Sequence, residues 1–262
     1  PESRPRAGTG TVESVVAPVP SWPREPRPQQ STPPAGAIAQ ACSAPAASSV
    51  TPCGYLVRRT GAGGRGAIRF SQPGITWQGA VTLAGDASIF TQSSGNTGTI
   101  TGSIGEIGGS RSLTFGGQSD GGIITLATAN TYTGATAVNR GTLRLTNAGA
   151  LGGSSGVTLT NTTVSGGSGT VLDLQNNITV AGIPLIMNSS SASDRRVSLV
   201  SSSGSNMWSG PITVNGTGLC IFNASGGNLT VNGNITDGGG FTGTVFVRGG
   251  NSGIINGVIS VP

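Results

Sequence analysis

The sequence predicts an all-β protein whose main part is a β-solenoid, a fold in which short strands wind into stacked coils. Three observations favour it. Short segments of two-residue apolar alternation recur along the chain, Gly-, Ser- and Asn-rich runs separate them, and aromatic residues make up only 4% of the sequence. Alternation is typical of strands with one buried face, and the Gly-rich runs suit tight corners. The aromatic residues are too few to fill the core of a β-sandwich.

Residues 1–70 differ in composition from the rest of the chain. Eleven of the 15 prolines lie within residues 1–52, and residues 1–70 carry eight Arg against three Glu, whereas residues 71–262 are neutral. Because proline fixes φ and lacks an N–H donor, such a run neither pairs in a sheet nor continues a helix. We expect residues 1–70 to be a disordered Pro/Arg-rich linker or tail. A basic binding arm is the alternative, but dense arginine clusters with interleaved aromatics are missing, so no nucleic acid is expected.

From residue 75 onward, Val, Ile or Leu recurs at every second position in short segments, and turns follow each segment at once. No stretch has helical periodicity, so residues 71–262 are predicted to contain strands alone. The expected strands lie within residues 80–85, 141–147, 156–161, 171–180, 196–201, 211–216, 228–233 and 244–249.

An internal match supports the solenoid. Residues 76–90 resemble residues 207–222, which aligns Trp77 with Trp208 and gives a repeat of about 131 residues. The match predicts a first copy over residues 71–205 and a partial second copy over residues 206–262, which favours a fragment of a longer array. Long-period duplication extends a solenoid naturally, since each coil contacts only its neighbours. With roughly 20–25 residues per coil, residues 71–262 would form about eight or nine coils.

One segment carries a more specific pattern. The residues "NTYTGATAVNRGTLRLTNAGALG" at 130–152 closely resemble the autotransporter-associated β-strand repeat, found in passenger domains of bacterial autotransporters and in related secreted proteins. The match is ungapped from Leu126 to Gly152. The residues that carry it are Leu126, Asn130, Thr131, Tyr132, Thr133, Gly134, Thr136, Val138, Gly141, Thr142, Leu143, Leu145, Ala150, Leu151 and Gly152.

The resemblance implies a right-handed parallel β-helix that is exported to the bacterial cell surface or beyond, with a role in secretion or surface display. The sequence contains no recognisable translocator barrel, so a link to the outer membrane would need a translocator from outside this chain. For an adhesin-like segment, surface glycans or the surface of a host or neighbouring cell are the partners to expect. The Pro-rich start has no counterpart in the family.

Side-chain directions within the motif follow from the same pattern. Leu143 and Leu145 are expected to point into the coil, as are Val157 and Leu159 one turn on. Tyr132 is expected to pack at a corner with its hydroxyl near the surface; a sugar-stacking aromatic is the alternative interpretation of this residue.

The composition argues against an enzyme. The chain has no His and no Lys. It therefore cannot use His to activate a Ser or Cys nucleophile, cannot form a His-bearing zinc site and has no Lys to bind phosphate. No cofactor, metal or catalytic residue is therefore predicted. Two Gly-rich patterns are not interpreted as sites, because the first lacks the strand and helix it needs and the second lacks a His or Lys that could activate its Ser. They are a dinucleotide-like spacing at Gly61, Gly63 and Gly66 with Asp86, and a nucleophile-elbow spacing at Ser154.

The three cysteines are interpreted as incidental. Cys42 and Cys53 could close a small loop in an oxidising compartment, whereas Cys220 lies in a buried-strand pattern where Cys acts as a small hydrophobe.

The enzymatic alternative is a β-helical polysaccharide lyase or hydrolase, which needs converging carboxylates. Asp173 and Asp194 with Arg195 and Arg196 form the one plausible group. Asp173 lies between Leu172 and Leu174, so its side chain should face outward, where a solvated residue is the expected outcome. The sequence thus favours a non-enzymatic structural or adhesin-like segment.

Overall fold

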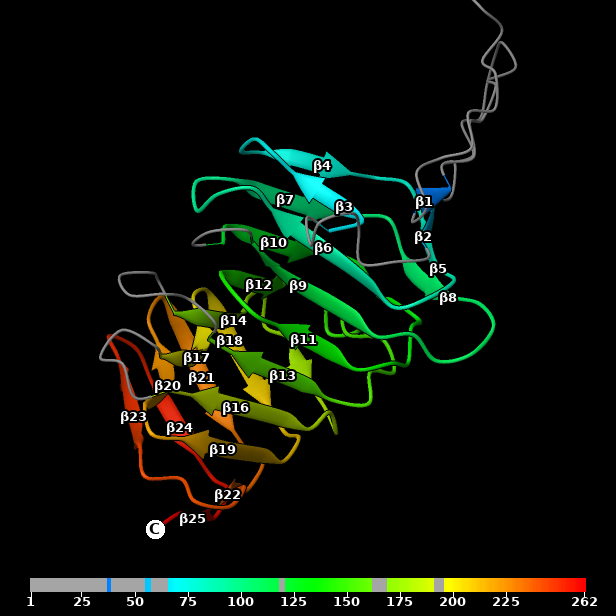
Figure 1. The fold of residues 1–262 in the computed structure, drawn as a ribbon. Helices are drawn as coiled ribbons and strands as arrows, with labels where there is room; N and C mark the ends of the chain where they lie inside the picture. The colour runs from blue at the N-terminus through cyan, green and yellow to red at the C-terminus, as the bar shows by residue number, and fades with distance from the viewer. Residues whose placement is uncertain (1–36, 39–54, 58–65, 118–120, 162–168, 191–195) are drawn as a thin grey trace, which may run out of the picture. The chain divides into compact units, whose positions relative to one another are not determined.

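The computed structural model of the 262-residue chain describes residues 37–38, 55–57, 66–117, 121–161, 169–190 and 196–262. All the regular secondary structure within these ranges is β-strand. The strands wind into stacked coils whose neighbouring strands run parallel, and the chain colours in Figure 1 follow the stack in order. The all-β fold and the β-solenoid predicted from the sequence are confirmed.

The largest sheet has nine strands and forms one face of the stack. Every neighbouring pair in it is parallel. Its strands are β3 (Ile68–Phe70), β6 (Ala87–Thr91), β9 (Leu113–Gly117), β11 (Thr136–Val138), β13 (Val157–Thr160), β16 (Leu185–Ser189), β19 (Ile212–Gly216), β22 (Ile235–Asp237) and β25 (Ile259–Ser260).

A second face is an eight-stranded parallel sheet. It contains β4 (Ile75–Trp77), β7 (Thr97–Ile100), β10 (Ile123–Leu126), β12 (Thr142–Leu145), β14 (Thr170–Leu174), β17 (Val197–Ser201), β20 (Leu219–Ala224) and β23 (Thr244–Gly249).

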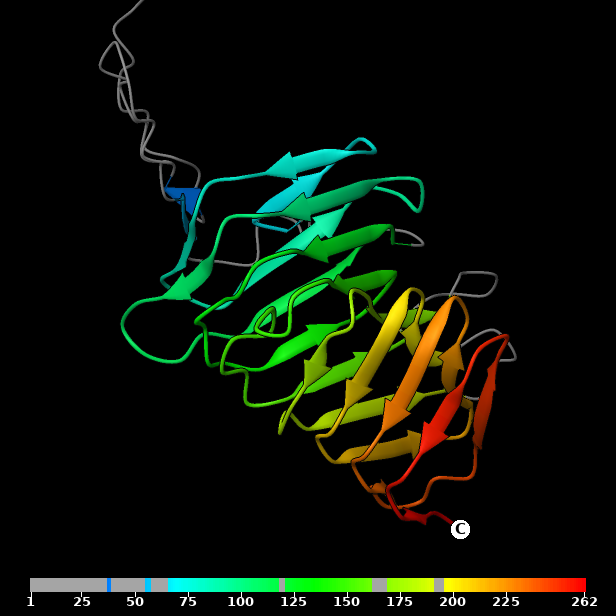
Figure 2. The same ribbon diagram turned by 180° about the vertical axis from the view of Figure 1, so that it is seen from behind.

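In chain order, a third face follows the eight-stranded sheet in each coil and precedes the next strand of the nine-stranded sheet. It holds two four-stranded sheets. Between them two successive coils cross this face without a strand, at residues 127–135 and 146–156. In Figure 2 the later sheet is the yellow, orange and red group. The strands of this face are β1 (Ala37–Ile38), β2 (Tyr55–Val57), β5 (Val81–Leu83), β8 (Ile104–Glu106), β15 (Thr179–Val180), β18 (Gly204–Trp208), β21 (Gly227–Val231) and β24 (Gly253–Ile255).

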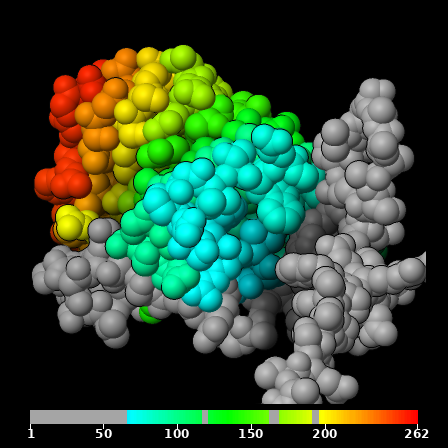
Figure 3. Space-filling view, turned by 90° about the horizontal axis from the view of Figure 1, so that it is seen from above, coloured from blue at the N-terminus to red at the C-terminus, as the bar shows by residue number. Residues whose placement is uncertain are grey.

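Coil length varies more than the sequence suggests. Ile124 pairs with Leu143 across a short coil, whereas Thr142 pairs with Val171 across a coil about half as long again. The expected range of roughly 20–25 residues per coil is therefore too narrow for the whole stack. In the space-filling view the first described coil, in cyan, faces the viewer and later colours lie behind it (Figure 3).

The core consists of columns of inward-facing apolar side chains, one residue from each coil. Such columns bury apolar surface without large side chains, because each residue is covered by its neighbours above and below. Leu143 and Leu145 are buried, as predicted, and so are Val157 and Leu159. Val157 and Leu159 were expected one turn after Leu143 and Leu145. They lie instead on the nine-stranded face, whereas Leu143 and Leu145 lie on the eight-stranded face. One column on the eight-stranded face runs Ile124, Leu143, Leu172, Leu199, Phe222 and Val247.

Three described strands within residues 1–70 pair with one another or with strands of the stack. β3 belongs to the nine-stranded sheet, β2 pairs in parallel with β5, and β1 pairs antiparallel with β2. The remaining part of the predicted disordered segment, residues 1–36, 39–54 and 58–65, lies outside the described residues.

Candidate functional site

The family-like segment occupies parts of two successive coils. It begins at Leu126, the last residue of β10, and crosses the third face. It then forms β11 and β12 and crosses the third face again. The two strand-free crossings still join neighbouring coils: the N–H of Thr131 donates to the carbonyl of Ile104 at 2.8 Å, and the N–H of Gly153 donates to that of Tyr132 at 2.9 Å. This segment therefore keeps coils in contact where regular strand pairing stops.

Asn130 supplies part of this contact with its side chain. Its Oδ1 accepts the N–H of Ile104 at 2.7 Å, and its Nδ2 donates to the carbonyl of Ala150 at 2.5 Å. The residue is buried and so links three successive coils through one amide. Buried backbone groups need such partners, because an unpaired one costs about 1–3 kcal/mol.

Tyr132 differs from the prediction. Its side chain is fully buried, and its hydroxyl lies 2.9 Å from Oγ1 of Thr136, which in turn lies 2.9 Å from Oγ of Ser154. Burial raises the pKa of Tyr132 to about 12. The predicted surface position of the hydroxyl is wrong, because Thr136 stands in a core column and its hydroxyl needs buried partners. A fully buried ring also has no face on which a sugar could stack.

Ser154 is thus part of this buried network. Its Oγ also donates to the carbonyl of Gly134 at 2.9 Å, so the elbow-like spacing marks a structural hydroxyl. Asp86 accepts the N–H of Ser112 at 2.9 Å, and Gly66 precedes β3 with a φ of +86°. Gly61 and Gly63 lie outside the described residues.

Sequence reasoning missed Glu106, a carboxylate at the end of β8. Its Oε1 accepts the N–H of Thr133 at 3.0 Å and the Thr133 hydroxyl, and its Oε2 accepts the N–H of Arg111 at 2.7 Å. Desolvation raises the pKa of Glu106, but these hydrogen bonds outweigh it and the net shift is downward. Nothing in the local pattern signals this role, because Glu106 and Thr133 belong to different coils.

Asp173 was expected to be a solvated outer-face residue, and this is wrong. Only 3% of it is exposed. Its Oδ2 accepts Nε of Arg144 at 2.8 Å and the hydroxyl of Ser202 at 2.8 Å. The side chain does leave the strand on the outer side, but groups from the coils before and after cover it. Gln175 joins the cluster through a 2.7 Å hydrogen bond to Ser202.

Among the described residues, no other member of the predicted enzymatic group is in contact with Asp173. Asp194 and Arg195 lie outside the described residues. Arg196 precedes β17, and its carbonyl accepts the N–H of Thr170 at 3.1 Å. The Oδ1 atom of Asp173 is buried without a hydrogen-bond partner.

Cys220 is buried on β20, as expected for a small hydrophobe, and its burial raises the thiol pKa to about 11. Cys42 and Cys53 lie outside the described residues. Among the described residues, no three His, Cys, Asp or Glu side chains gather as metal ligands, and no helix is long and apolar enough to cross a membrane.

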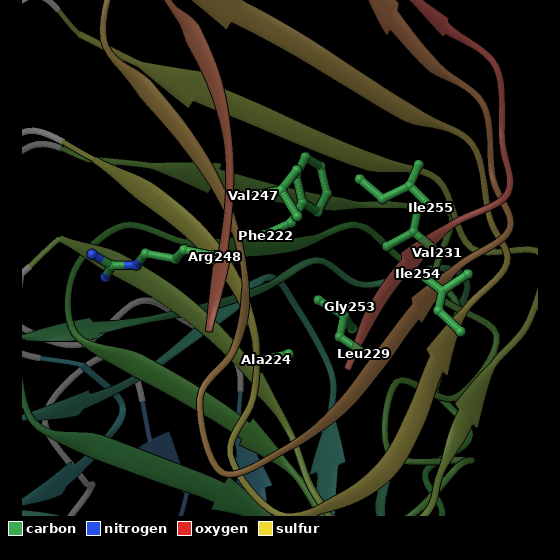
Figure 4. Close-up of a pocket in the computed structure, with 9 residues that line it drawn as sticks. All are labelled: Phe222, Ala224, Leu229, Val231, Val247, Arg248, Gly253, Ile254 and Ile255. Atoms are coloured by element: carbon green, nitrogen blue, oxygen red, sulfur yellow. The ribbon is translucent and has the colours of Figure 1, made fainter. Parts of the chain in front are cut away.

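A small cavity of about 10 Å³ lies at the C-terminal end of the stack, with room for about one water molecule. Figure 4 shows Phe222 and Val247 close together, while Arg248 points away from the other side chains. The lining residues are Phe222, Ala224, Leu229, Val231, Val247, Arg248, Gly253, Ile254 and Ile255.

Comparison with known protein families, curated proteins and solved structures finds no match for this chain. The likeness of residues 126–152 to the autotransporter-associated repeat therefore stays a sequence-based prediction. The β-solenoid stands on the strand pairing alone.

Proposed function

We propose that this chain is a non-enzymatic structural or adhesin-like segment of a secreted or surface-displayed bacterial protein, similar to an autotransporter passenger. Its work would be to form a stiff spacer and to assist export and surface display. The observation that carries the proposal is the unbroken parallel pairing of the nine-stranded sheet from β3 to β25. In such a stack each coil rests on its neighbours, so the fold suits an extended element.

The polar side chains support the same role. The amide of Asn215 donates to Asn188 at 2.9 Å, and the amide of Asn256 donates to Asn232 at 2.8 Å. Each pair joins two successive coils on the outside of the stack. Ladders of this kind stabilise stacked strands, so these polar residues contribute to stiffness.

Surface display is tested on cells that produce the protein. Antibodies against residues 66–262 should label intact cells or detect the protein in the medium, and external protease should remove the cell-bound signal. A cytoplasmic protein serves as the control and should stay protected. Signal that appears only after lysis would contradict the proposal.

The enzymatic alternative is tested on purified protein with pectin and related polysaccharides. We expect no depolymerisation above the level of an Asp173→Asn variant. Depolymerisation by the wild type that Asp173→Asn abolishes would contradict the structural role and support a lyase or hydrolase activity.

A further inference from the structure

Three Asn-Gly pairs occur in the sequence, at residues 215–216, 232–233 and 256–257. Asparagine is a chemically labile residue, and a following glycine makes it more so, because no side chain hinders the next backbone nitrogen. That nitrogen attacks Cγ of the asparagine, its proton leaves with the amide as ammonia, and a succinimide ring forms. Water then opens the ring at either carbonyl, which gives aspartate or isoaspartate. Spontaneous deamidation of this chain is therefore expected first at these three pairs.

The glycines of these pairs lie where successive coils approach closely. A Cβ atom at Gly216 would collide with the carbonyl oxygen of Ser189, and one at Gly233 would collide with that of Gly210. Isoaspartate in place of the preceding asparagine would lengthen the backbone by one methylene at the same point. Because closely packed structures have little room for added atoms, this change would disturb the contact between coils.

All three asparagines belong to the two amide pairs that join successive coils. Nδ2 of Asn215 donates to Oδ1 of Asn188 at 2.9 Å, and Nδ2 of Asn256 donates to Oδ1 of Asn232 at 2.8 Å. Asn188 is itself anchored, since its Nδ2 donates to Oγ1 of Thr160 at 3.3 Å. Each amide is thus held toward a neighbouring coil, whereas succinimide formation requires it to turn toward the glycine of its own coil. The hydrogen bonds oppose that rotation.

The pair at Asn232 separates the effect of the amide from that of the backbone. Asn232 follows β21, and among the described residues no hydrogen bond engages the N–H of Gly233. The attacking nitrogen is therefore not held by the backbone ladder. Both ends of the side-chain amide are held instead: Oδ1 accepts from Asn256, and Nδ2 donates to Sδ of Met207 at 3.2 Å.

We propose that Asn215, Asn232 and Asn256 are deamidation sites, and that amide pairing with the neighbouring coil keeps them intact in the folded protein. The pairs then set the chemical lifetime of the stack, in addition to their contribution to stiffness. Asn188 is a positioning residue in this scheme, because it acts through the side chain of Asn215. The proposal concerns the folded chain itself and is independent of export.

Mass spectrometry of peptides from the 262-residue chain tests this proposal. The protein is incubated at mildly alkaline pH, and the fraction of each asparagine converted to aspartate or isoaspartate is followed with time. All three sites should react more slowly in the folded chain than in urea. Asn188→Ala should raise the rate at Asn215 by roughly 2- to 10-fold, the factor that corresponds to one net hydrogen bond. The rates at Asn232 and Asn256 should not change.

Asn256→Ala gives the reciprocal result, a faster reaction at Asn232 with no change at Asn215. Asn223→Ala is the matched control. Asn223 is a half-buried residue of β20 that takes part in neither amide pair, so this variant should leave all three rates unchanged. Circular dichroism should report an intact fold for each variant.

Three results would overturn the proposal. Equal rates in the folded and unfolded chains would show that folding gives no protection. An unchanged rate at Asn215 in Asn188→Ala would assign the protection to the strand backbone. A rise at all three sites in that variant would attribute the reaction to general loosening of the fold.

Discussion

At the scale of single residues, glycines at one corner of the coil let neighbouring coils approach closely. A Cβ atom at Gly233 would collide with the carbonyl oxygen of Gly210, one coil earlier, and one at Gly257 would collide with that of Gly233. The three glycines thus form a column at the corner between the third face and the nine-stranded face.

Gly233→Ala should destabilise the fold by about 1–3 kcal/mol, the usual cost of overpacking. Gly95→Ala is the control, because a Cβ at Gly95 meets nothing within 4 Å. Its effect should stay within about 0.5 kcal/mol. Urea unfolding of both variants checks this, and equal effects would show that the column does not set the coil spacing.

Tyr132→Phe should cost about 1 kcal/mol, since it removes a buried hydrogen bond but leaves Thr136 paired with Ser154. The pKa of Tyr132 is raised to about 12, above the usual value of about 10 in an unfolded chain. Its contribution to stability is therefore complete below about pH 10 and is lost as the pH rises toward 12.

Phenolate absorbance checks this assignment. The chain has two tyrosines, and the wild type should show a titration step near pH 12 that Tyr132→Phe removes. A Tyr132 that titrates at the ordinary value for an exposed phenol would mean that its hydroxyl reaches solvent.

At the scale of elements, strand positions follow from the sequence but strand partners do not. Residues 141–147 and 171–180 predict strands because their apolar residues alternate. β12 and β15 lie within these ranges, and β14 begins one residue earlier, at Thr170. The burial of Asp173 escaped prediction because its partner Arg144 lies on the preceding coil, and the chain between the two is longer than one expected coil. A signal was present: Leu143, Arg144 and Leu145 have the same pattern as Leu172, Asp173 and Leu174, which stacks the two charges.

The Arg144–Asp173 pair should couple two coils measurably. Its Nε–Oδ2 distance is 2.8 Å, and the Asp173 side chain is 4% exposed against 29% for Arg144. Asp173→Asn should cost about 2 kcal/mol, as for a hydrogen bond to a charged group. In a double-mutant cycle with Arg144→Gln, the coupling energy should exceed the roughly 0.2–1 kcal/mol of exposed pairs. A coupling near zero would assign the burial of Asp173 to packing alone.

At the scale of the whole stack, the internal match between residues 76–90 and 207–222 relates different faces. Trp77 lies in β4 of the eight-stranded face, whereas Trp208 lies in β18 of the third face. Val81 lies in β5 of the third face, whereas Ile212 lies in β19 of the nine-stranded face. The offset corresponds to five coils and one additional face. The duplication stays a prediction, and in the fold its matched residues share a strand–corner–strand context, not a column.

The fold class could be predicted because alternation and corner composition are local properties of the chain. The two strand-free crossings of the third face could not be predicted. Residues 127–135 match the family repeat, but the repeat pattern does not indicate which face of the coil these residues cross. The buried positions of Tyr132 and Asp173 likewise depend on partners in other coils, which are Ser154 through Thr136 for Tyr132, and Arg144 and Ser202 for Asp173.

The register of the nine-stranded face supplies the most direct test of the stacked-coil fold. Outward residues Thr114, Ala137, Thr158, Ile186, Thr213, Thr236 and Ser260 form one column in successive coils. Spin labels at Thr114 and Thr213, and at Thr114 and Ser260, are separated by four and six coil steps. At about 4.8 Å per step, the backbone separations should be roughly 19 and 29 Å.

Pulsed electron spin resonance on the two doubly labelled chains, with the native cysteines replaced, measures these separations. The stacked-coil fold predicts two narrow distributions whose mean distances differ by two coil steps, about 10 Å. Broad distributions, or separations that do not increase with the number of coils, would contradict the β-solenoid and with it the structural role proposed for this chain.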